Sequence, residues 1–80
     1  MNSHVKNSII DGLKNRSLGH LLIQREHWVR SLIVRISAYQ FALKDKCAPH
    51  TVNVKMMLVD DAIDWIGIYD DAIEDCEGRK

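Results

Sequence analysis

The chain of 80 residues contains few residues that interrupt helices and few that form cross-links. One proline and four glycines leave few positions at which a long helix has to end. Two cysteines do not make a disulfide framework, so we expect free thiols in a reducing cytoplasm. No apolar run reaches the roughly 18 residues of a membrane span, and the N-terminal sequence lacks a signal-peptide core, so we expect no membrane association.

The sequence also lacks the motifs that build most catalytic sites. It contains no CxxC or HExxH motif and no glycine-rich phosphate loop. His20 and His27 stand on one face of a predicted helix but about 10.5 Å apart along its axis, so one metal ion cannot bind both. We therefore expect no catalytic residues, no cofactor and no metal site.

The composition, 46% hydrophobic and 28% charged, is typical of a globular chain, and its length suits a single domain over residues 1–80. The formal net charge of zero hides an asymmetry. Residues 1–46 hold eight Lys and Arg against three Asp and Glu, whereas residues 47–80 hold three against eight. Two halves of opposite charge either attract each other within a hairpin or dimer, or one of them binds another molecule.

The longest helical pattern follows Pro49 and covers about residues 51–77. Its apolar residues recur at steps of four and three, which predicts an amphipathic helix. They are Val52, Met56, Val59, Ala62, Ile66, Tyr69, Ile73 and Cys76.

A second long helix is predicted over about residues 18–46, with Ser17 as its N-terminal cap. Its seam has the same steps of four and three. The seam residues are Leu18, Leu22, Arg25, Val29, Leu32, Ile36, Tyr39 and Leu43. Arg25 is the one charge in this seam, and a charge there costs stability unless it is paired.

A short helix over about residues 4–14 precedes these two, with Asn2 or Ser3 as its cap. Gly12 and the polar residues 15–17 weaken its end, although a helix continuous with the next segment is the alternative. The short link at about residues 46–51 joins antiparallel helices. The predicted fold is therefore all-α: a long antiparallel helical hairpin with a short N-terminal helix. This register places Arg25 beside residues 70–75, where an acid can pair with it and fix the register.

Both long helices are apolar on more than one side, so each needs more neighbours than the other helix. The additional apolar residues are predicted to mediate self-association into a dimeric bundle. These residues are Ile23, Val34, Phe41, Trp65 and Ile68.

The last predicted helix has an acidic face, which comes from two similar acidic segments, DDAID at 60–64 and DDAIED at 70–75. Its residues are Asp60, Asp61, Asp64, Asp71, Glu74 and Asp75. Like charges one turn apart destabilise a helix by roughly 0.2–0.5 kcal/mol per pair, so helix stability alone does not favour this pattern. The face is either solvated and partly neutralised by the basic half, or it docks on a basic protein surface in the manner of nucleic-acid phosphates.

These features predict a small protein–protein interaction module, in one form an inhibitor or regulator that occupies the basic, nucleic-acid-binding surface of another protein. Compact proteins of this kind suit a phage or mobile element. A nucleic-acid-binding regulator that uses the basic helix over residues 14–46 is the alternative. A more remote one is a Mg²⁺-dependent diphosphate enzyme, because the pattern of Asp60, Asp61 and Asp64 matches carboxylates that hold Mg²⁺.

Overall fold

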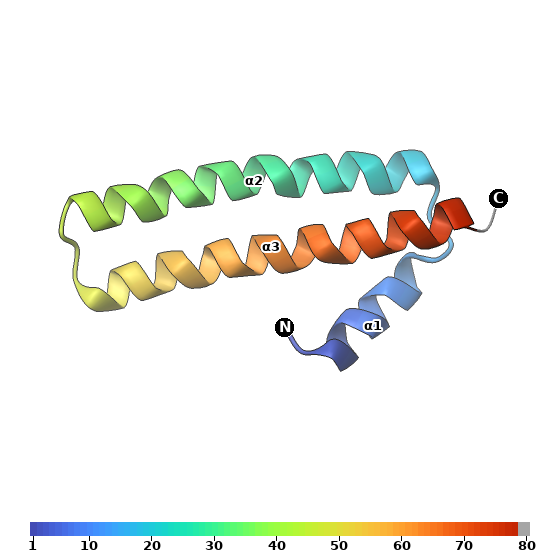
Figure 1. The fold of residues 1–80 in the computed structure, drawn as a ribbon, viewed down its shortest axis with the longest axis horizontal. Helices are drawn as coiled ribbons and strands as arrows, with labels where there is room; N and C mark the ends of the chain where they lie inside the picture. Colours follow the sequence, from blue (N-terminus) through green and yellow to red (C-terminus); the bar gives the residue numbers. More distant parts are fainter. Residues whose placement is uncertain (79–80) are drawn as a thin grey trace.

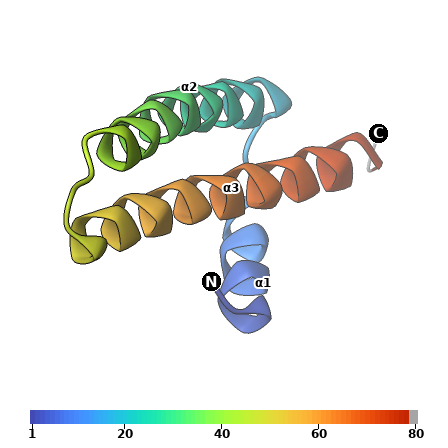
Figure 2. The same cartoon turned by 60° about the vertical axis from the view of Figure 1, so that its left-hand side comes forward.

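The computed structural model describes residues 1–78, which form three helices joined by two short connections (Figure 1). Helix α1 spans Ser3–Leu13, α2 spans Leu18–Lys44 and α3 spans Pro49–Gly78. The two long helices pack against each other as an antiparallel hairpin, and the molecule is 50 Å long. Helix α1 packs on α3 and projects from it on the side away from α2 (Figure 2). The predicted all-α hairpin with a short N-terminal helix is confirmed.

Side chains of the expected type cap the first two helices. The Asn2 Oδ1 atom accepts a hydrogen bond from the Val5 N–H at 2.9 Å, and the Ser17 Oγ atom accepts one from the His20 N–H at 3.2 Å. Because Ser17 starts a new helix, the alternative of one continuous helix is wrong. Helix α3 begins at Pro49 rather than at the predicted residue 51, because a proline at the first helical position loses no hydrogen bond and already has a helical φ.

The turn between α2 and α3 is a Schellman motif that ends α2 at Lys44, slightly before the predicted residue 46. Lys46 adopts the left-handed conformation with a φ of 54°. The Cys47 N–H donates to the Ala42 carbonyl at 3.0 Å, and the Lys46 N–H donates to the Leu43 carbonyl at 3.2 Å. These two bonds satisfy carbonyls that the helix end leaves open, and the chain then reverses into α3.

The core is small and lies toward the open end of the hairpin, where all three helices meet. It is centred on Leu21, Tyr69 and Ala72. Partly buried residues from all three helices pack against this centre: Leu13, Trp28, Trp65, Ile73 and Cys76. Elsewhere along the hairpin, Ala42 and Ala62 are buried.

The face of α2 that contacts α3 is not quite the predicted seam. At every second seam position, the contact is made by the preceding residue of the sequence. Its buried and half-buried residues are Leu21, Arg25, Trp28, Leu32, Arg35, Tyr39 and Ala42. Arg25, Leu32 and Tyr39 were predicted, but Leu22 and Leu43 are about half exposed, at 48% and 50%. Relative to the prediction, the helix is rotated about its axis. In this rotation Trp28 stacks on Trp65 of α3 and Arg35 reaches the Leu58 carbonyl, contacts that the purely apolar seam would not make.

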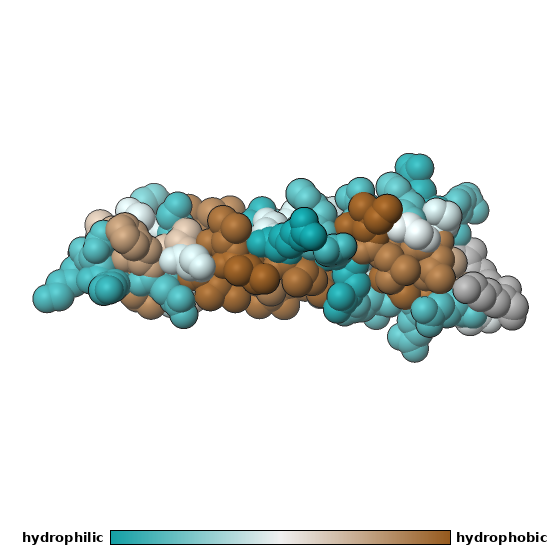
Figure 3. Space-filling view, turned by 90° about the horizontal axis from the view of Figure 1, so that it is seen from above, coloured by the Kyte–Doolittle hydropathy of each residue, from teal (hydrophilic) through white to brown (hydrophobic). Residues whose placement is uncertain are grey.

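The predicted free thiols are present. Cys47 lies in the turn and Cys76 near the end of α3, and both are free, half-buried cysteines. Among residues 1–78, no helix combines the length and the apolar character that a membrane crossing requires. Viewed from the α2 side, hydrophobic residues gather along much of the length of the molecule, between hydrophilic side chains (Figure 3).

Candidate functional site

The predicted acidic face divides into two groups in the structure. At about 100° per residue, Asp60, Asp64 and Asp71 lie on the side of α3 opposite the buried Tyr69 and Ala62, so they point away from α2. Asp61 lies nearer the hairpin interface, where α2 reaches it. The six predicted residues therefore do not act as one uniform surface.

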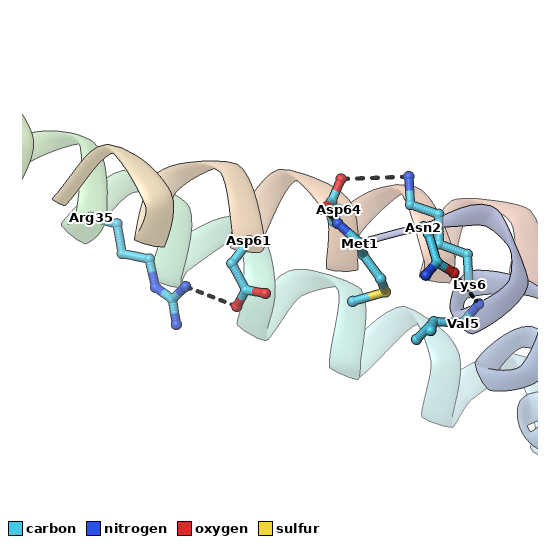
Figure 4. A network of polar contacts seen from close by, with 7 residues as sticks. All are labelled: Met1, Asn2, Val5, Lys6, Arg35, Asp61 and Asp64. Atoms are coloured by element: carbon cyan, nitrogen blue, oxygen red, sulfur yellow. Dashed lines mark hydrogen bonds and ion pairs between the residues drawn. The ribbon is translucent and has the colours of Figure 1, made fainter. Parts of the chain in front are cut away.

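Asp64 is held by the N-terminal segment of the same chain. Its Oδ2 atom lies 3.1 Å from the Met1 amine, and its Oδ1 atom lies 3.4 Å from Lys6 Nζ (Figure 4). The hydrogen bond from the Met1 amine lowers the pKa of the Asp64 carboxyl; partial desolvation opposes this, and the Lys6 charge reinforces it. These contacts fasten the start of α1 to α3.

Asp61 is held by Arg35 of α2. The Arg35 Nη1 atom lies 3.4 Å from Asp61 Oδ2 (Figure 4). It also donates a hydrogen bond of 2.7 Å to the Leu58 carbonyl. The guanidinium carbon also lies 5.3 Å from the centre of the Trp28 ring, within the range of a cation–π interaction. Arg35 therefore joins α2 to α3 through the Leu58 carbonyl and the Asp61 carboxylate, while the Trp28 ring of its own helix packs against the guanidinium.

The remaining acids of the predicted face are exposed. The side chains of Asp60, Asp71 and Glu74 form no hydrogen bond or ion pair with any residue of the described part of the chain. Asp75 is also exposed and does have an interaction. We call Asp60, Asp71 and Glu74 the outer acids. They are what remains of the predicted partner-binding site after the contacts within the chain are made.

An open pocket of about 430 Å³ lies where the start of α1 meets α3. Its lining consists of Met1, Met57, Leu58, Asp60, Asp61 and Asp64. All three acids of the predicted Mg²⁺-binding motif thus line this pocket. Asp61 already faces Arg35, however, and Asp64 already faces Lys6 and the terminal amine. Among residues 1–78, no group of three or more His, Cys, Asp and Glu side chains is arranged to hold a metal ion.

The basic helix presents its arginines to neighbouring acids. Arg25 pairs with Asp70 of α3, an acid in the predicted segment, and Arg35 pairs with Asp61. Arg30 pairs with Glu26 one turn earlier in its own helix, at 2.7 Å. A nucleic-acid footprint requires a cluster of cations on one face that can reach phosphates. These three arginines instead have carboxylate partners within the chain.

The residues predicted for self-association fall into three environments. Ile23, Val34 and Phe41 are 66%, 68% and 65% exposed, along the side of α2 that faces away from α3. Trp65 is half-buried because it stacks on Trp28. Ile68 is 1% exposed and is not a surface residue, so its assignment is wrong. It stands one turn after Asp64, on the side of α3 to which the N-terminal segment is fastened.

Two features of this surface escaped the sequence analysis. One is the role of Arg35, which the sequence pattern does not distinguish from the other cations of the basic helix. The other is the stack of Trp28 on Trp65, which a comparison of their nearly equal distances from the turn would have suggested.

Comparison of the chain with known protein families, with curated proteins and with solved structures finds no match. No function can therefore be carried over from a related protein. The exposed surfaces of the hairpin are the basis on which a function can be argued.

Proposed function

We propose that this chain is a protein–protein interaction module that docks the outer acids of α3 on a basic surface of another protein. The observation that carries the proposal is the exposure of Asp60, Asp71 and Glu74 without a partner among the described residues. Neutralisation by the basic half of the chain accounts for Asp61, Asp64 and Asp70, but it does not account for these three.

The shape of the molecule supports the same proposal. A rigid helical hairpin displays side chains at fixed spacing, and acids along one helix can follow a row of cations on a partner. Basic rows of this kind are typical of proteins that bind nucleic-acid phosphates, so an inhibitor that occupies such a row is the specific form we propose. The alternative of direct nucleic-acid binding has less support, because Arg25, Arg30 and Arg35 have carboxylate partners.

Two further parts of the proposal concern state and location. We propose that the module acts as a homodimer, since many apolar side chains stay exposed on the hairpin. We also place its action in the cytoplasm, because free thiols at Cys47 and Cys76 suit a reducing compartment.

The test compares capture of partners by the chain and by the double variant Asp60→Asn/Asp71→Asn. The matched control is Asp11→Asn/Glu26→Gln, which removes the same charge from exposed positions on α1 and α2. We expect the chain and the control to capture the same basic protein, and nucleic acid or added salt to release it. Capture that survives in the double variant would argue against docking through the outer acids.

A further inference from the structure

One flank of α2 is apolar and remains uncovered in the hairpin. At about 100° per residue, its members fall within an arc of about 80° beside the face that contacts α3. They are Leu22, Val29, Ile33, Ile36 and Leu43. Ile33, at 60% exposed, is the most open of them.

A matching flank runs along α3, again within an arc of about 80°. It consists of Val52, Met56, Val59, Ile63 and Ile66. Met56 and Ile63 are 43% and 51% exposed, and the other three are half-buried. Each long helix thus presents an apolar strip that the monomer covers only in part.

The two flanks lie on the same side of the hairpin. In antiparallel neighbours, equal rotations from the shared interface lead to the same side, and the ion pairs of the hairpin follow this rule. Arg25 stands one turn from Leu22 and its partner Asp70 one turn from Ile66, so this pair marks the end of the apolar side. The pair of Arg35 and Asp61 marks the opposite side, which the N-terminal segment approaches. We call the ten residues of the two flanks the apolar face.

We infer that a second copy of this chain covers the apolar face, in an antiparallel two-fold arrangement that makes a four-helix bundle. The two flanks span residues 22–43 and 52–66, which is about 32 Å and about 21 Å, and at a width of about 10 Å they present about 500 Å². Two copies together therefore bury about 1,000 Å², the lower limit for a specific interface. A two-fold dimer also requires a surface that complements itself, and an apolar strip of this kind does so.

Charge selects the antiparallel arrangement. The turn end of the hairpin carries Lys44, Lys46 and Lys55 against the single acid Asp45. The open end carries Lys14, Arg16 and Arg25 against a larger number of acids on the last turns of α3: Asp70, Asp71, Glu74, Asp75 and Glu77. A two-fold axis across the middle of the hairpin places each acidic end beside the basic end of the other copy. A parallel arrangement would instead bring the two acidic ends together.

The helix dipoles are antiparallel in this arrangement, as they are in the parallel one, in which α3 lies beside the oppositely directed α2 of the second copy, so the side-chain charges alone make the choice. In the antiparallel dimer, α3 lies beside α3 of the second copy in the opposite direction. The acidic C-terminal turns then approach the N-terminus of the neighbouring α3, which carries a partial positive charge. Glu74 comes to lie near Lys55 of the other copy, and this contact occurs twice by symmetry. Asp60 and Asp71 lie on the side of α3 away from this contact, so in the dimer these two outer acids stay available to a basic partner.

This inference rests on the homodimer of the proposed function. It adds which face of the hairpin forms the interface and in which relative direction the two copies run. Sedimentation of the full chain at high micromolar concentration, compared with Ile33→Glu/Ile63→Glu, tests the face. The matched control is Ile23→Glu/Val34→Glu, which makes the same change on the far side of α2, because this inference moves the interface away from these two residues of the sequence-based assignment. We expect the chain and the control to have twice the mass of 9.2 kDa, and the face variant to dissociate with a Kd at least about 100-fold higher.

A milder variant, Ile33→Gln/Ile63→Gln, serves if circular dichroism shows that the glutamates unfold the helices. A monomeric wild-type chain, a face variant that still dimerises, or a control variant that dissociates would overturn the inference. An apolar face that takes up a different protein while the chain stays monomeric would do the same.

Charge reversal tests the direction. Glu74→Lys should weaken the dimer at low salt, and Lys55→Glu added to it should restore the dimer. A dimer strengthened by Glu74→Lys alone would indicate the parallel arrangement and overturn this part. The variant Asp60→Asn/Asp71→Asn should keep its dimeric mass, so loss of partner capture and loss of dimerisation can be told apart.

Discussion

Trp28 of α2 and Trp65 of α3 stack across the hairpin, with ring centroids 5.3 Å apart and planes within 6° of parallel. Tyr69 continues the aromatic cluster at 6.4 Å from Trp65, and Arg35 lies over the Trp28 ring. These are the two tryptophans of the chain, so one contact joins the long helices through their largest side chains. In so small a core, we expect this stack to carry much of the stability.

Trp28→Ala should lower the free energy of unfolding by about 2–3 kcal/mol, because it removes both the buried area and the stacking geometry. Trp28→Phe keeps an aromatic ring and should cost about 1 kcal/mol. Ile23→Ala, on the exposed side of α2, should stay within about 0.5 kcal/mol of the unchanged chain. Urea denaturation at one fixed protein concentration measures all three, and equal losses for Trp28→Ala and Ile23→Ala would contradict the prediction.

This stack also explains which part of the fold the sequence could not predict. Apolar spacing predicts the helices, their caps at Asn2 and Ser17, and their antiparallel pairing. It does not predict the rotation of α2, because the strip through Leu22 and the strip through Leu21 are both spaced by four and three. The choice depends on pair contacts, here Trp28 on Trp65, which the spacing within one helix does not contain.

The acidic site shows the same limit in another form. Helical periodicity places Asp60, Asp64 and Asp71 on one side of α3, as the structure does. Which acids stay available to a partner depends on where α1 packs and how far Arg35 reaches. Both are determined by the tertiary structure. Only the assembled chain shows that Asp64 faces Met1 and Lys6.

Arg25→Ala should reduce the free energy of unfolding by about 1 kcal/mol or less. The side chains of Arg25 and its partner Asp70 are 41% and 50% exposed, so solvent screens the attraction between the two charges. Neither charge is buried enough for its loss to leave the other one desolvated. Arg25→Leu should be tolerated, since leucine extends the apolar side of the hairpin at this position. Denaturant unfolding at a concentration low enough to keep the chain monomeric measures this, and a loss of several kcal/mol for Arg25→Ala would contradict the prediction.

Arg35→Ala should cost more than Arg25→Ala, about 2 kcal/mol. Its side chain is 24% exposed, and it donates to the Leu58 carbonyl besides pairing with Asp61 and lying over Trp28. Arg35→Lys should recover only part of the loss, because an ammonium group lacks the planar fork that reaches several groups at once. Denaturant unfolding of the three variants in parallel gives the comparison, and an Arg35→Ala that matches Arg25→Ala would refute it.

Lys46→Gly should stabilise the protein by about 1 kcal/mol. Lys46 occupies the left-handed region at a φ of 54°, where a Cβ atom costs roughly 1–2 kcal/mol and glycine pays no such cost. The matched control is Asp45→Gly, because Asp45 has a φ of −80° and gains no relief from losing its side chain. A thermal midpoint that rises in both variants, or in neither, would mean that backbone strain at Lys46 is not the cause.

Asp64→Asn should loosen α1 from α3 while leaving the hairpin intact. The substitution removes the carboxylate that faces the Met1 amine and Lys6, so the amides of Ile9, Ile10 and Leu13 should exchange with solvent faster near neutral pH. Asp60→Asn is the control, because Asp60 is an exposed neighbour without a partner in the described part of the chain. Unchanged exchange in α1 of Asp64→Asn would show that apolar contacts alone hold this helix.

Lowering the pH should loosen α1 in the unchanged chain as well. The pKa of Asp64 lies below its ordinary value in the folded chain, so the folded state favours the carboxylate. The contribution of Asp64 is therefore complete above the ordinary value of about 3.9 and is lost as the pH falls through the lower folded value. NMR shifts of the α1 amides should follow this titration in the unchanged chain and in Asp60→Asn, and should lack it in Asp64→Asn. A midpoint above about 3.9 would mean that the Met1 and Lys6 cations do not stabilise the ionised carboxylate, and that another group fastens α1 to the hairpin.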